Sequence, residues 1–62
     1  MTAKSLVGKA IRYRSRATSP WHIATVLEVT LEKVMLLDFE GEYVKQRDDI
    51  EWMIWNGNLE VV

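Results

Sequence analysis

The chain has 62 residues, of which 48% are hydrophobic, so we expect residues 1–62 to form one small domain rather than a disordered segment. With no cysteine and one histidine, the sequence predicts no disulfide, no metal site and no bound cofactor. The longest apolar runs have four residues, which predicts a cytoplasmic protein without a membrane span. The net charge of −1 argues against a dedicated nucleic-acid binder.

Charge is distributed unevenly along the chain. Residues 1–16 carry five basic side chains and no acidic one, whereas residues 17–62 carry three basic and all nine acidic side chains. A basic first segment of this kind can bind phosphate groups, or it can lie beside an acidic strand of the same domain. For a domain of this size we favour the second interpretation.

Residues 9–16 alternate in polarity and predict a first strand, with Ile11 and Tyr13 on one face. The other face carries three arginines: Arg12, Arg14 and Arg16. Their spacing of about 6–7 Å along a strand approximates the spacing of phosphates in nucleic acid, so they are the candidate nucleic-acid contacts. The preferred interpretation is a charged strand that protects a sheet edge from aggregation.

A loop at residues 17–20 contains a Ser-Pro pair, which favours a turn, and residues 21–30 then predict a second strand. The alternative is a helix over residues 24–33, but the many β-branched residues in this segment suit a strand better. Apolar residues occur on both faces of the segment. The strand is therefore covered on both sides or carries a bulge.

Residues 33–40 predict a third strand, and residues 43–47 predict a fourth that pairs with it. The turn between them is acidic, with carboxylates at Asp38, Glu40 and Glu42. Their spacing does not match that of a calcium-binding loop, so we expect a solvated acidic turn.

Residues 50–55 are largely apolar and run into Asn56-Gly57, which is a strong signal for a two-residue hairpin turn. This pattern predicts a strand over residues 50–55 that is joined to a last strand at residues 58–62. Asp48 and Asp49 can also cap a short helix over residues 50–55, so both structures remain open for that segment.

Short strands over most of a chain of this length predict an all-β fold, a small and strongly bent five-stranded barrel. Over roughly residues 7–62, the order of elements resembles the SH3-like barrels and is most similar to the Tudor group. The residues that carry the resemblance are Gly8, the segment Trp21–Val26, the strand Val34–Phe39 with the turn Glu40-Gly41-Glu42, and the pair Ile50-Glu51.

Tudor domains that bind methylated side chains surround them with several aromatic residues. The resemblance implies that the corresponding cage candidates are Tyr13, Trp21 or His22, Phe39 and Tyr43. The segment Trp52–Gly57 departs from the family pattern.

The large aromatic residues are expected either in the core or on a partner surface. Burying a large ring contributes much to the stability of so small a protein, so we expect Trp21, Phe39 and Trp52 in the core. An exposed Trp55 would mark a surface for a partner. The candidate partner surface is Tyr13, Trp21, Tyr43 and Trp55.

The aliphatic residues that fall on the predicted inward faces define the expected core. It comprises Ile11, Ala24, Val26, Leu36, Ile50 and Leu59, with either Val34 or Met35 depending on the strand register.

The sequence contains no phosphate-binding loop, dinucleotide motif or nucleophile elbow, and His22 has no partners for a catalytic triad, so we expect no enzyme. The leading hypothesis is a non-catalytic protein-binding module, a small adaptor or inhibitor of bacterial or phage type. The alternative is a nucleic-acid-binding barrel that uses the three arginines of the first strand.

The apolar terminal segment, residues 58–62, predicts a strand at a sheet edge that can pair with a second copy of the chain. Trp55, Val61 and Val62 would pack at the contact between the copies. We therefore expect a homodimer.

Overall fold

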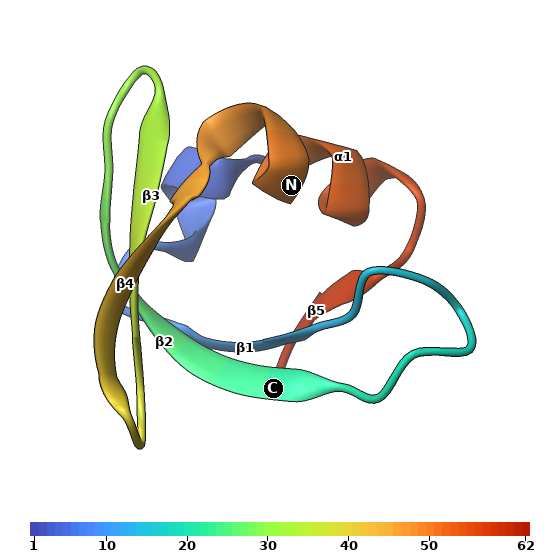
Figure 1. The fold of residues 1–62 in the computed structure, drawn as a ribbon. Helices are drawn as coiled ribbons and strands as arrows, with labels where there is room; N and C mark the ends of the chain where they lie inside the picture. The colour runs from blue at the N-terminus through green and yellow to red at the C-terminus, as the bar shows by residue number, and fades with distance from the viewer.

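The computed structural model describes residues 1–62, which form one five-stranded sheet, one α-helix and a short 3-10 helix (Figure 1). In chain order the elements are η1 (Ala3–Leu6), β1 (Ala10–Tyr13), β2 (His22–Val29), β3 (Lys33–Asp38), β4 (Gly41–Gln46), α1 (Arg47–Trp55) and β5 (Leu59–Val61). The strands are antiparallel in the order β4-β3-β2-β1-β5. The prediction of a mostly β protein is therefore confirmed.

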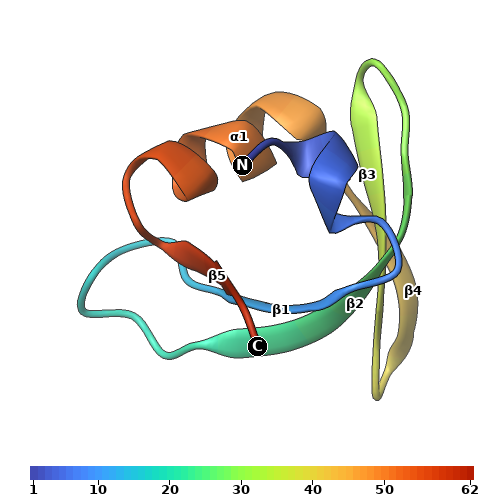
Figure 2. The same cartoon turned by 180° about the vertical axis from the view of Figure 1, so that it is seen from behind.

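The sheet is open, because no ladder of hydrogen bonds joins its two edge strands, β4 and β5. The closed barrel expected from the sequence is therefore not confirmed. α1 connects β4 to β5 and contacts both of them. The sheet bends strongly, and α1 and η1 lie on its concave side (Figures 1 and 2). The helix thus covers the core at the place where a closed barrel would have paired strands.

The strand β2 carries a bulge, which is one of the two alternatives that its apolar pattern left open. Its register with β3 shifts between Val26 and Glu28, where one additional residue is accommodated. Val26 is buried on the concave face. Because a bulge bends its strand and increases the local twist, this feature contributes to the curvature of the sheet. The helical alternative over residues 24–33 is excluded by the strand His22–Val29.

The first strand is shorter than predicted, since β1 ends at Tyr13 instead of continuing to residue 16. In the observed register Tyr13 lies opposite His22, so a longer strand would place Ser15 opposite Pro20. Proline has no N–H to donate to a ladder, and pairing therefore stops before it. As a consequence, the predicted row of three arginines on one strand is wrong. The interpretation of this strand as a protected sheet edge is also wrong, because β1 lies between β2 and β5.

Residues 50–55 are helical, so the strand expected there is wrong and the helical alternative is confirmed. The capping role expected of Asp48 and Asp49 is wrong, because α1 begins at Arg47 with Gln46 as its N-cap, and both aspartates lie inside the first turn. The expected hairpin at Asn56-Gly57 is also wrong. A hairpin turn of that type needs positive φ at both residues, but Asn56 has φ −92° and only Gly57 has a positive value, 80°.

The Asn-Gly pair instead ends the helix. Asn58 donates its backbone N–H to the carbonyl of Met53 (2.9 Å), and Gly57 donates to the carbonyl of Ile54 (3.4 Å). These two bonds form the Schellman arrangement, in which a residue with positive φ follows the last helical turn. Glycine adopts that conformation without the strain that a Cβ atom would cause.

The core lies between the concave face of the sheet, α1 and η1. Its 11 buried residues are Ala3, Leu6, Ile11, Tyr13, Ala24, Val26, Val34, Leu36, Ile50, Met53 and Leu59. All the predicted core residues are among them, and Val34 rather than Met35 faces inward. The sequence did not predict η1, whose Ala3 donates its backbone N–H to the carboxylate of Glu51 on α1 (2.9 Å).

Two aromatic residues expected in the core are exposed, and a third is only half-buried. Phe39 is 96% exposed because it lies at the β3–β4 turn, where no other layer covers it. Trp52 is 61% exposed because Ile50 and Met53 occupy the face of α1 that packs on the sheet. Trp21 is half-buried.

Candidate functional site

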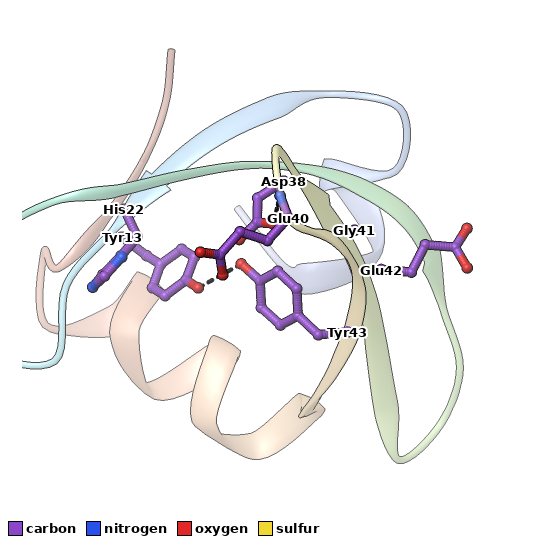
Figure 3. Close-up of a pocket in the computed structure, with 7 residues that line it drawn as sticks. All are labelled: Tyr13, His22, Asp38, Glu40, Gly41, Glu42 and Tyr43. Carbon is purple, nitrogen blue, oxygen red and sulfur yellow. Dashed lines mark hydrogen bonds between the residues drawn. The ribbon is translucent and has the colours of Figure 1, made fainter.

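A pocket of about 460 Å³ lies between the ends of β1 and β2 and the β3–β4 hairpin (Figure 3). Its aromatic lining residues are Tyr13, His22 and Tyr43, and its acidic lining residues are Asp38, Glu40 and Glu42. The antiparallel pairing brings these residues together, because the end of β1 lies opposite the start of β2 and the acidic turn connects β3 to β4.

The two tyrosines form the wall of the pocket. Their hydroxyl oxygens are 2.6 Å apart, which is a short hydrogen bond, and the ring of Tyr13 is stacked against His22 with 5.6 Å between ring centroids. Burial of Tyr43, its hydrogen bond to Tyr13 and the charge of Asp38 all raise the pKa of the Tyr43 hydroxyl well above its usual value. Tyr43 therefore keeps its proton to higher pH than an ordinary tyrosine does.

The rim of the pocket carries negative charge without compensating partners. Asp38 accepts a hydrogen bond from the backbone N–H of Glu40 (2.8 Å), whereas the carboxylates of Glu40 and Glu42 have no hydrogen-bond or ion-pair partner. In Figure 3, Asp38 and Glu40 lie on the side of the tyrosine hydroxyls and Glu42 points away from them. Aromatic walls next to free carboxylates favour a cationic ligand.

We predict that Tyr43→Phe costs about 0.5–1.5 kcal/mol at neutral pH, the usual net contribution of one hydrogen bond. Unfolded tyrosine ionises near pH 10, whereas folded Tyr43 keeps its proton to higher pH. Rising pH therefore favours the unfolded wild-type chain, and the variant lacks this effect of Tyr43. Urea unfolding from neutral pH to about pH 11 should show the stability difference between the two proteins shrinking. A constant difference would contradict the prediction.

The structure brings together some of the predicted cage residues and separates others. Tyr13, His22 and Tyr43 line one pocket, whereas Phe39 points into solvent outside it and Trp21 is covered by arginine side chains. The contribution of the acidic turn to this pocket was missed, because the sequence indicated only a solvated loop. The presence of three carboxylates within five residues, next to a predicted strand end, was the available signal.

Two of the three candidate arginines are engaged within the domain. Arg12 forms an ion pair with Glu60 on β5, and its Nε lies 3.0 Å from that carboxylate. Arg14 donates to the side chain of Asn58 (3.1 Å) and to the carbonyl of Ala17 (3.2 Å). These contacts support the interpretation that the basic first segment pairs with residues of its own domain.

The guanidinium carbons of these two arginines lie 4.3 Å and 4.1 Å from the ring centroid of Trp21. The ring and its charged neighbours therefore form one internal cluster. Arg16 is exposed and has no side-chain hydrogen bond. Nucleic-acid binding by the arginines stays a prediction, and it would have to compete with the internal contacts of Arg12 and Arg14.

Comparison of the chain with protein-family models, curated proteins and solved structures finds no match. None of its helices has the length and apolar character that crossing a membrane requires. No group of three histidine, cysteine, aspartate or glutamate side chains is placed to hold a metal ion.

Proposed function

We propose that this chain is a non-catalytic protein-binding module with a Tudor-like, SH3-like fold, and that its tyrosine pocket receives a basic side chain of a partner protein. The observation that carries the proposal is the combination of a tyrosine pair with the uncompensated carboxylate of Glu40, which lies on the side of the tyrosine hydroxyls. The strongly bent, antiparallel five-stranded sheet supports the fold assignment.

The pocket suits a cation for two independent reasons. An ammonium or guanidinium group placed against an aromatic face is attracted by the ring quadrupole, and this attraction grows as the group loses water. The carboxylates at the rim add a Coulomb attraction that an anionic or neutral side chain would not experience.

The test is a titration of the protein with a short peptide that contains one lysine. Binding is monitored by nuclear magnetic resonance. The same peptide is also used with a trimethylated lysine and with glutamine in place of lysine. Both lysine peptides should shift the signals of Tyr43 and His22, whereas the glutamine peptide should not. Tighter binding of the trimethylated peptide would support methylated side chains as the ligand, which is the class that the Tudor resemblance implies.

The matched variants are Glu40→Gln at the rim and Glu28→Gln on β2, outside the pocket; each removes one negative charge from an exposed side chain. Glu40→Gln should weaken binding about three- to tenfold, the range expected for loss of one favourable charge contact. Equal weakening by both variants would mean that only net charge attracts the peptide, and the proposed site would then be wrong.

A further inference from the structure

A second aromatic surface lies on α1, on residues that do not line the tyrosine pocket. Trp52 and Trp55 are 61% and 77% exposed, and their rings are stacked with 5.2 Å between centroids and 25° between planes. Ile50 and Met53 anchor the opposite face of the helix in the core, so the pair projects from a fixed element. Two adjacent exposed tryptophans are unusual unless they bind something, since tryptophan is among the residues that dominate binding energy at interfaces.

The charge around this pair is negative. A shallow hollow is lined by the two tryptophans together with Asp48 and Glu51. Glu51 is compensated within the chain, because it pairs with Arg47 (3.5 Å) and accepts the backbone N–H of Ala3. Asp48 has no hydrogen-bond or ion-pair partner, and neither has Asp49, which lies beside Trp52 in the neighbouring hollow.

The chain supplies a cation to its other tryptophan but not to this pair. Trp21 has the guanidinium groups of Arg12 and Arg14 over its ring. Lys45 lines the hollow beside Trp52, but its ammonium lies over the ring of Tyr13. Trp52 and Trp55 are therefore exposed aromatic rings with free carboxylates beside them and no cation from their own chain.

From this arrangement we propose that the surface formed by Trp52, Trp55, Asp48 and Asp49 binds an arginine-bearing segment of a partner protein. Arginine fits better than lysine, because a planar guanidinium stacks on an indole ring and can donate hydrogen bonds to a carboxylate at the same time. Tryptophan is the aromatic residue that attracts cations most strongly. Charge complementarity thus selects a basic partner segment, and ring geometry selects arginine within it.

The experiment uses the whole chain and a short synthetic peptide of alternating arginine and alanine, with matched peptides in which lysine or citrulline replaces arginine. The signals of the three indole N–H groups are followed by nuclear magnetic resonance and assigned with single Trp→Phe variants. The arginine peptide should shift the signals of Trp52 and Trp55 and leave that of Trp21 in place. It should bind more tightly than the lysine peptide, and the uncharged citrulline peptide should bind least.

The variants separate this surface from the tyrosine pocket. Trp55→Ala should reduce the affinity measured from the Trp52 signal at least about tenfold, as expected for a central aromatic contact. Asp48→Asn combined with Asp49→Asn should reduce both the affinity and its dependence on salt. Phe39→Ala is the matched control, because it removes an exposed aromatic ring that lies outside this surface. It should leave the affinity for the arginine peptide unchanged. Tyr43→Phe and Glu40→Gln should leave the Trp52 and Trp55 shifts intact.

Three outcomes would overturn the proposal. The first is arginine-peptide binding that survives Trp55→Ala but is lost with Glu40→Gln, which would place the ligand in the tyrosine pocket. The second is equal binding of the arginine and citrulline peptides. The third is a dimer in sedimentation that Trp55→Ala dissociates in the absence of peptide, since the pair would then be covered by a second copy of the chain. Because Trp55 is largely exposed, an unchanged circular dichroism spectrum is expected for its variant.

Discussion

Replacing Leu36 by alanine should lower the free energy of unfolding by about 2–5 kcal/mol, the range measured when a large aliphatic side chain is removed from a core. Leu36 has no exposed surface and lies on β3 at the centre of the sheet, where it is paired with Val26 on one side and Tyr43 on the other. The cost is close to the whole stability of about 5 kcal/mol that so small a domain can be expected to have. The variant should therefore unfold at a much lower urea concentration than the wild type.

The matched control is the adjacent residue in the same strand. Leu37 has the same side chain but points to the convex face of the sheet and is 40% exposed. Folding removes less of the apolar surface of Leu37 from water. Leu37→Ala should therefore lower the free energy of unfolding by less than about 1.5 kcal/mol. If the two variants unfold at similar urea concentrations, the assignment of the two faces of β3 would be wrong.

Replacing Ile50 by alanine should also cost about 2–5 kcal/mol, for a different structural reason. Ile50 is fully buried and lies in the first half of α1, which it holds against the concave side of the sheet together with Met53. A helix of nine residues is not stable by itself, so its helical structure depends on this packing. Far-ultraviolet circular dichroism should show loss of the helical signal as part of the same unfolding transition.

Ile23→Ala is the control for this variant, because Ile23 is 65% exposed on β2 and makes little contact with the core. It should melt within a few degrees of the wild type, whereas Ile50→Ala should melt far below it. A variant at position 50 that keeps both its helical signal and its melting temperature would show that α1 is held by other contacts.

The strands could be predicted from the sequence because their signal is local. In β3, residues 34–37 are all apolar, so the sequence left the choice between Val34 and Met35 open. In β1, the alternation of Ile11 and Tyr13 with arginines identifies the two faces of the strand. The predicted core agrees with the structure for this reason. The end of β1 was less predictable, since it depends on the register that places Ser15 opposite Pro20.

The pocket could be predicted only in part. Tyr13 and Tyr43 were candidates because of the family resemblance, but their contact joins residues 30 positions apart and follows from how β1 and β4 face each other across the bent sheet. The roles of Asp38 and Glu40 at the rim also depend on that arrangement. Local periodicity contains no information about which strand ends meet in space.

What the sequence alone determined is the approximate positions of the five strands and most of the aliphatic core, because period-two alternation is a property of consecutive residues. The structure of residues 50–55 was decided by tertiary packing. Their apolar side chains suit either a strand or a helix, and Asn56-Gly57 ends a helix as well as it forms a hairpin. Packing of Ile50 and Met53 on the concave face selects the helix. That choice turns Trp52 and Trp55 outward and leaves the sheet open.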